Sequence, residues 1–228
     1  MEHPLDNPVW PAVTGPQQHL SVLAEPLVAG RFAPAVSVFG GMADRSRESW
    51  DALATVLEGE VVGLLTADEV EVPEGWRTFA AVPCHQYVAD DLPPAPELDL
   101  LDLGPDDAAE MQALVELTEP GPFGPRTHEM GTYLGLRRGG ALLAMAGQRL
   151  RLPGHTEISA VCVHPDARRE GLGAALTLAV AERIRAAGDE AFLHVRVENT
   201  GAIELYDRWG FRRRRDIIIT VVAPERPS

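Results

Sequence analysis

The second half of the chain alternates between strand-like and helix-like spacing of its hydrophobic residues. Glycine and proline pairs at positions 139–140 and 153–154 are turn signals, so neighbouring strands are expected to form hairpins. Strands are expected at 98–103, 131–138, 141–152, 157–163, 192–197 and 211–222. Helices are expected at 105–117, 171–187 and 201–209. This order predicts an α/β protein with a mixed, largely antiparallel sheet.

The first half gives a weaker pattern because prolines interrupt it. A helix is expected at 44–57, and short strands at 60–65 and 76–82. Three prolines lie in the four residues 93–96, where neither a helix nor a central strand can continue. We therefore place a domain boundary near Glu97, between an N-terminal lobe of unclear role (1–97) and a second domain (98–228).

Charge narrows the possible functions. The net charge is −14, and all 20 basic residues are arginine. The absence of lysine excludes Schiff-base enzymes and phosphate-binding P-loops, which both need one. Residues 1–98 hold 15 acidic residues and four arginines, so most of the negative charge lies in the N-terminal lobe. Such a chain is a poor binder of nucleic acid or anionic membranes, and we expect neither as a partner.

Other sequence features favour a reduced, cytoplasmic protein. The two cysteines, Cys84 and Cys162, lie in unrelated contexts, which favours free thiols over a disulfide. The seven histidines show no metal-ligand spacing, so no metal is expected. No apolar run reaches the roughly 18 residues of a membrane span, and Met1–Gly15 lacks the basic start of a signal peptide.

The most informative stretch joins the expected strand 157–163 to the helix that follows. The strand ends at Pro165, and Gly171 and Gly173 then stand at the start of the helix. Unpaired backbone amides at a helix N-terminus attract anions, and Arg168 and Arg169 add positive charge there. This pattern indicates a phosphate-binding loop, although an ordinary glycine-containing turn is an alternative. A dinucleotide-binding Rossmann loop is disfavoured because the third glycine is missing.

The segment Arg168-x-x-Gly171-x-Gly173 resembles the acetyl-CoA pyrophosphate signature of the GNAT N-acetyltransferase superfamily. A run from Phe192 to Phe211 is similar to that superfamily's second signature, and the resemblance covers about 98–222. Residues 156–165 look like the glycine N-acyltransferase-like branch. The resemblance implies an acyl-CoA N-acyltransferase fold with splayed parallel central strands, here preceded by the acidic N-terminal lobe.

The resemblance also implies that acetyl-CoA is the acyl donor and which residues contact it. In the resembled fold the pantetheine arm lies between the splayed strands and the pyrophosphate on the loop amides. The matching positions are Val161, Cys162, Val163, Arg168, Arg169, Glu170, Gly171, Leu172, Gly173, Ala174 and Asn199. Asn199 is equally well placed as an N-cap for the helix 201–209, and both roles can coexist.

Tyr206 occupies the position that the resemblance gives to the general acid, which protonates the departing thiolate. A tyrosine that only packs on the sheet is the alternative. Glu157 is the candidate base, provided that burial raises its pKa. A structural or solvated glutamate is the alternative for Glu157, and a packed strand histidine is the main interpretation of His194.

Arg126, His128 and Glu129 fall where this fold usually forms the acceptor pocket. Arg126 could bind an acceptor carboxylate through two hydrogen bonds, although such loop charges are often solvated or part of a gate. Four consecutive arginines, Arg212–Arg215, are interpreted as a strand end that pairs with acidic residues, since the negative net charge disfavours nucleic acid.

The sequence therefore predicts an acetyl-CoA-dependent N-acetyltransferase in which a primary amine, on a small molecule or a peptide, attacks the thioester directly. Cys162 as an acyl carrier and a non-catalytic acyl-CoA-binding module are the alternatives. Two hypotheses about the acceptor conflict: the acidic lobe favours cationic amines, whereas the glycine-acyltransferase resemblance favours small amino acids held by Arg126. A monomer and a homodimer both remain open.

Overall fold

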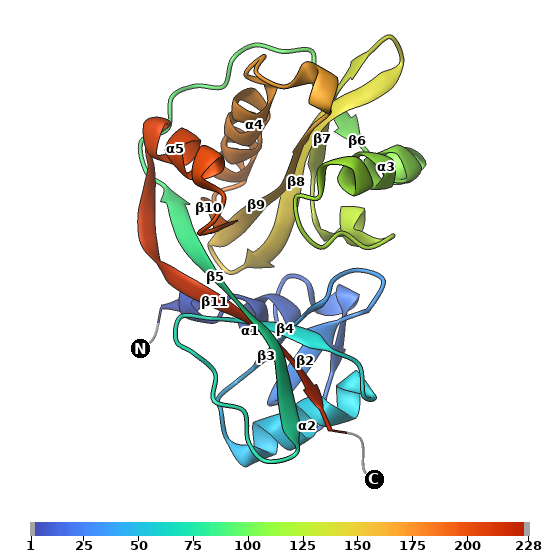
Figure 1. Cartoon of the computed structure of the whole chain (residues 1–228), viewed down its shortest axis with the longest axis vertical. Helices are drawn as coiled ribbons and strands as arrows, with labels where there is room; N and C mark the ends of the chain where they lie inside the picture. The colour runs from blue at the N-terminus through green and yellow to red at the C-terminus, as the bar shows by residue number, and fades with distance from the viewer. Residues whose placement is uncertain (1–2, 226–228) are drawn as a thin grey trace.

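The structure is a computed structural model that describes residues 3–225. Within them, eleven strands form one sheet in the order β1-β2-β3-β4-β11-β5-β10-β9-β8-β7-β6 (Figure 1). The strands are β1 (Ser21–Leu23), β2 (Ala29–Phe32), β3 (Phe39–Met42), β4 (Val62–Thr66), β5 (Trp76–Ala89), β6 (Leu101–Leu103), β7 (Tyr133–Arg138), β8 (Ala141–Leu152), β9 (His155–Val163), β10 (Glu190–Arg196) and β11 (Phe211–Pro224). The α-helices are α1 (Val9–Val13), α2 (Arg47–Leu57), α3 (Ala108–Thr118), α4 (Leu172–Ala186) and α5 (Thr200–Arg208).

Two long strands, β5 and β11, connect the halves of the molecule. They pair antiparallel from Phe211 opposite Ala89 to Pro224 opposite Trp76, and they run from the upper to the lower half in Figure 1. β11 pairs with β4 on its other side, and β5 pairs with β10. The chain crosses the expected boundary at Glu97 between β5 and β6. β5, which precedes that boundary in the sequence, therefore lies between β11 and β10 in the middle of the sheet.

Helices cover both faces of the C-terminal part of the sheet. Alternate residues of β8 belong to different cores, because successive side chains of a strand point to opposite faces. Ala144 and Ala146 join the core under α4, whereas Met145 joins the core under α3. A separate core around Trp50 packs α2 against the N-terminal strands. The gap between β9 and β10 thus lies in a sheet that is supported from both sides.

The expected fold class is confirmed, and the elements of the second half lie within about three residues of the predicted bounds. Two features of the first half differ. The structure adds α1 and β1–β3, which the proline-rich pattern did not predict, and β5 continues past Pro83 to Ala89. Pro83 is tolerated because β10 begins to pair with β5 only at Cys84, so no ladder bond needs the missing amide there.

Within residues 3–225, no helix is long and apolar enough to cross a membrane. The same residues contain no group of three or more His, Cys, Asp or Glu side chains that could hold a metal ion.

Candidate functional site

The two parallel strands β9 and β10 separate in the middle of the sheet. They pair only from Glu190 opposite His155 to Phe192 opposite Glu157. Beyond these residues β9 follows β8 as far as Val163, and β10 follows β5 as far as Arg196. Beyond Glu157 and Phe192, the facing edges of β9 and β10 therefore do not pair with each other. An extended ligand could add to the edge of β9 as a further strand.

A β-bulge marks the point on β9 where the strands diverge. One residue lies between Met145 and Gly147 on β8, but two lie between their partners Cys162 and Ser159 on β9. Ala160 takes up the extra residue with φ +51°, a conformation that is uncommon for a non-glycine residue. The bulge turns backbone groups of β9 away from the ladder, next to the expected path of the acyl group.

The loop after β9 presents a row of unpaired backbone amides. None of the six amides from Arg169 to Ala174 has a hydrogen-bond acceptor among residues 3–225, and no side chain caps α4. Arg169 (φ +68°) and Gly171 (φ +80°) have left-handed conformations, which make successive N–H groups converge. Together with the helix dipole, this arrangement forms an anion-binding site of the kind that holds a pyrophosphate.

The charges around this loop also suit an anion. Arg168 and Arg169 are exposed and form no ion pair within the described part of the chain. Glu170 is neutralised by Arg138 of β7, with Nη2 donating to Oε2 at 2.6 Å. A Cβ added at Gly173 would lie 3.6 Å from Val163 and 3.8 Å from Val161, so this glycine sits over the end of β9 without filling the space. The loop and the free edge of β9 therefore form one continuous surface.

Tyr206 lies in an aromatic cluster on α5. Its ring packs against Tyr87, Trp209 and Phe211, with centroid distances of 6.0, 6.2 and 5.6 Å. Burial raises its pKa to about 12. No atom of residues 3–225 hydrogen-bonds to its hydroxyl, so the phenol stays protonated at neutral pH and free to donate.

Asn199 caps α5, because its side-chain oxygen accepts a hydrogen bond from the Ala202 amide at 3.2 Å. The capping interpretation of this residue is therefore confirmed. Its side-chain NH₂ group has no partner within residues 3–225, so contact with a ligand stays a prediction.

Glu157 is fully buried in an ion pair with Arg149 of β8. The Arg149 guanidinium donates to both carboxylate oxygens, from Nε at 2.8 Å and from Nη2 at 2.6 Å. Burial alone would raise the pKa of Glu157, but Arg149 and a hydrogen bond with His194 outweigh burial and lower it to about 2. The condition under which Glu157 would act as a base, a pKa raised by burial, is therefore not met, because Arg149 pairs with this carboxylate.

A chain of buried polar groups continues from Glu157 across the sheet. His194 Nδ1 lies 2.7 Å from Glu157, and His194 Nε2 lies 2.9 Å from Gln86 Nε2. The Gln86 oxygen accepts from Arg214, and its nitrogen donates to the Leu5 carbonyl. Because both partners fix the Gln86 amide, its nitrogen must donate to His194 Nε2. The His194 ring is therefore held from both sides, with Nε2 at Gln86 and Nδ1 at Glu157.

The run of arginines at the start of β11 pairs with acidic residues, as expected. The pairs are Arg212–Asp90, Arg213–Asp216, Arg214–Asp6 and Arg215–Asp6 with Asp68. The Arg214 pair ends the polar chain described above and ties the N-terminal segment to the sheet.

A narrow pocket opens beside the bulge of β9. The segment 120–123 after α3 lines it, together with the buried side chains of Arg149 and Tyr133. Ser159 and Ala160, consecutive residues of the bulge, both line the pocket, and Thr127 completes it. Arg149 is 9% exposed, and its Nη1 has no acceptor among residues 3–225. The guanidinium thus has one edge fixed by Glu157 and a second edge that faces the pocket.

Of the residues predicted for the acceptor, His128 and Glu129 lie on the adjoining turn, Thr127–Met130, and Arg126 directly precedes it. Arg126 donates to both oxygens of Glu129, at 2.7 and 2.6 Å, and this lowers the pKa of Glu129. Neither residue lines the pocket. His128 has a buried Nδ1 without a partner within residues 3–225. Of the segment 126–131, only Thr127 lines the pocket itself.

Both cysteines are buried free thiols. Burial raises the pKa of Cys162 and of Cys84 to about 11. Cys162 belongs to the core under α3, on the opposite face of β9 from Val161 and Val163. A thiol that stays protonated and packed in a core is poorly suited to carry an acyl group.

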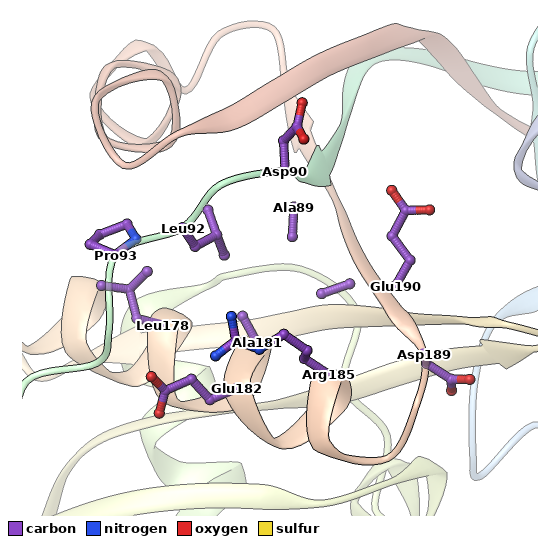
Figure 2. A pocket seen from close by; sticks show the side chains of 11 residues that line it. Ala89, Asp90, Leu92, Pro93, Leu178, Ala181, Glu182, Arg185, Asp189 and Glu190 are labelled. Atoms are coloured by element: carbon purple, nitrogen blue, oxygen red, sulfur yellow. The ribbon is translucent and has the colours of Figure 1, made fainter.

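A second cavity, of about 190 Å³, lies between α4, β10 and the segment after β5 (Figure 2). Ala89, Asp90, Leu92 and Pro93 lie over the C-terminal half of α4 in this view. The helix lining begins at Leu178, six residues or about 9 Å beyond the first residue of α4. The cavity is therefore separate from the loop at the N-terminus of the same helix.

Two functional candidates were missed in the sequence. Arg149 and Gln86 are buried polar residues in strands that are otherwise largely apolar. Pairing β8 with β9 through the turn at Pro153-Gly154 brings Arg149 near Glu157, and this signal was available in the sequence. Gln86 had no such signal, because the strand was expected to end at Val82.

Comparisons with known proteins agree with this geometry. The FR47-like protein family model matches residues 133–218. A solved structure from Novosphingobium aromaticivorans, assigned to the GNAT family as an acetyltransferase, is 34% identical, with a TM-score of 0.89 over 99% of this chain and 100% of its own. A GCN5-related N-acetyltransferase from Kribbella flavida shares the fold, with 18% identity and a TM-score of 0.63 over 96% of each chain.

A curated relative, the mycothiol acetyltransferase of Thermobispora bispora, is 45% identical over 58 residues. The match covers 25% of this chain and only about a fifth (20%) of that relative. The full-length similarity to the Novosphingobium protein decides the family: this chain belongs to the GNAT family of acetyltransferases.

Proposed function

We propose that the protein is an acetyl-CoA-dependent N-acetyltransferase that transfers the acetyl group directly to a primary amine. The observation that carries this proposal is the continuous surface formed by the free edge of β9 and the six unpaired amides from Arg169 to Ala174. An extended arm ending in a pyrophosphate fits such a surface. The thioester bound there would supply an acyl group that is activated towards amines.

The loop amides and two exposed arginines hold the phosphates in this proposal. Arg168 and Arg169 lie beside the amides and add charge to them. The edge of β9 around Val161 and Val163 aligns the arm by backbone hydrogen bonds, and the bulge at Ala160 turns further groups of the strand towards the reacting carbonyl. Asn199 adds a side-chain donor from the N-terminus of α5.

Tyr206 is the proposed general acid. Its raised pKa, about 12, keeps the phenol protonated until a thiolate forms. The aromatic cluster around it fixes the ring, so that the hydroxyl is positioned without the help of a hydrogen-bond partner.

Glu157 acts in this proposal as the counter-ion of Arg149. A carboxylate whose pKa is about 2 is a weak proton acceptor at neutral pH. The Nε2 atom of His194 is already hydrogen-bonded to Gln86, so in this proposal the amine loses its proton to solvent. The pair Glu157–Arg149 then serves to orient the pocket beside the bulge.

The resemblance to the glycine N-acyltransferase-like branch and the partial match to a mycothiol acetyltransferase support a small amine as the acceptor in this proposal. The acceptor would enter through the pocket between 120–123 and β9, where the bulge faces it.

The experiment that tests the proposal measures thiol release from acetyl-CoA over a panel of amines, together with the dissociation constant of CoA. We expect tight binding of CoA and thiol release that depends on the amine. CoA binding without release under any condition would support the alternative, a non-catalytic acyl-CoA-binding module. Absence of CoA binding would contradict both.

A further inference from the structure

The pocket beside the β9 bulge contains one buried cation whose outer edge has no partner. Arg149 is the only charged side chain that lines this pocket among the described residues. Nε and Nη2 are occupied by Glu157, whereas Nη1 finds no acceptor within residues 3–225. Nη1 is not fully buried, and Arg149 lines the pocket, so this nitrogen reaches the pocket. A donor that reaches a pocket is available to an acceptor on a ligand or to water.

The charge of Arg149 is already balanced. Glu157 is ionised, and its two oxygens accept from the guanidinium. Arg214, further along, pairs with Asp6. A ligand carboxylate at Nη1 would therefore add a second negative charge to a buried cation that Glu157 already neutralises. An uncharged oxygen would satisfy the same donor without that cost.

The lining of the pocket also favours an uncharged group. The pocket is small, with a volume of about 10 Å³. Ser159 and Thr127 contribute only neutral groups to the lining. A carbonyl oxygen fits this end of the pocket, with the rest of the acceptor towards the bulge.

The absence of a strong base at the site also favours an acceptor whose amine has a low pKa. An ordinary α-amino group has a pKa of about 7.7–8.0, whereas a lysine-like alkylamine has one of about 10.4. A larger fraction of the former is uncharged at neutral pH, so it can attack without a base whose pKa matches its own. An amine next to a carbonyl group is of this kind.

We infer that Arg149 binds the acceptor through an uncharged carbonyl oxygen adjacent to the amine, so that the acceptor is an α-amino amide, as at the N-terminus of a peptide, and not a free amino acid. This inference rests on the proposed function, because it places the acceptor amine beside the bulge of β9. It replaces the expected carboxylate clamp at Arg126 with a neutral hydrogen bond at Arg149.

Three compounds with the same arrangement of heavy atoms test the inference. N-acetylglycinamide, N-acetylglycine and N-isobutylacetamide carry an amide, a carboxylate and a branched alkyl group at one position. As acetylated products they have no titrating amine. Their affinities are measured by calorimetry, with and without bound CoA. We expect N-acetylglycinamide to bind about 10-fold more tightly, or better, than the other two, the difference typical of a hydrogen bond to a charged donor.

The double variant Arg149→Met with Glu157→Gln removes both charges and leaves no unpaired ion. It should reduce the affinity for N-acetylglycinamide to that for N-isobutylacetamide and leave the dissociation constant of CoA unchanged. Arg151→Met is the matched control, because Arg151 is an exposed arginine on the same strand whose side chain lies outside the pocket. It should preserve the preference.

Equal affinities for the three compounds in the wild-type protein would overturn the inference, as would tightest binding of N-acetylglycine or a preference that survives in the double variant. These outcomes are distinct from failure of the proposed function. That failure would appear as absence of thiol release with every amine, including glycinamide, whether or not the three products bind differently.

Discussion

Replacing Arg149 with methionine should cost the protein about 3–5 kcal/mol of unfolding free energy, because it leaves the buried Glu157 carboxylate without its main partner. The structure gives a consistent magnitude. Lowering the pKa of Glu157 from 4.5 to about 2 corresponds to about 3 kcal/mol at 1.36 kcal/mol per pKa unit. Glu157 is fully buried, so solvent does not screen this interaction.

The contribution of Glu157 to stability should depend on pH, with opposite signs in the wild type and in Arg149→Met. In the wild type the pKa of Glu157 is lowered on folding, so its contribution is present above about pH 4.5 and is lost as the pH falls towards 2. In Arg149→Met, burial raises the pKa of Glu157 above its unfolded value. Stability is then lost as the pH rises through that raised value and recovered on acidification. The difference between the proteins should therefore be smaller at pH 5 than at pH 7.

Urea unfolding followed by tryptophan fluorescence at pH 7 and pH 5 provides the assay. The control is the double variant Arg149→Met with Glu157→Gln, which should lose less stability than the single variant because no ion is left unpaired. The reasoning is refuted if the single variant is as stable as the double variant, or if the difference from the wild type does not shrink at pH 5.

Three further predictions concern the acyl-donor and acceptor sites. Gly173→Asp should abolish the thermal stabilisation by acetyl-CoA, since it places a carboxylate among the loop amides. Gly104→Asp, at an open position outside the loop, should keep that stabilisation. An unchanged thermal shift in both variants would exclude the loop as the acetyl-CoA site. Tyr206→Phe should lower kcat by about 100-fold or more with little change in acetyl-CoA affinity, and an equal loss of both would make Tyr206 a binding group. If the acidic residues of 1–98 attract cations, kcat/KM for spermidine should fall more steeply with ionic strength than kcat/KM for glycinamide, and parallel salt profiles would contradict this idea.

The sequence predicted the donor side of the site better than the acceptor side. Gly171, Gly173 and the strand before them are local signals, because a phosphate loop is built from backbone amides of consecutive residues. The bulge at Ala160 was not predicted, since no residue type marks it. The N-cap role of Asn199 was predicted from its place before a helix, and it is confirmed.

The acceptor side depends on contacts between distant strands. The pKa of Glu157 could not be inferred correctly without Arg149, and His194 Nε2 finds its hydrogen-bond partner in Gln86. Gln86 lies 108 positions before His194 and stands in a strand that was expected to end at Val82. Patterns of spacing within one segment say little about such pairings, because they are set by the order of strands in the sheet.

The placement of β5 between β10 and β11 has a consequence for how the chain folds. β11 ends at Pro224, yet its partner β5 ends at Ala89, more than 120 residues earlier. Pairing across that separation requires closure of a very long loop, which is slow relative to the formation of local hairpins. During synthesis β5 must therefore wait with both of its edges exposed until β10 and β11 have been made. A fragment that begins at residue 98 would leave the edges of β10 and β11 without their central partner, and such edges are prone to aggregation.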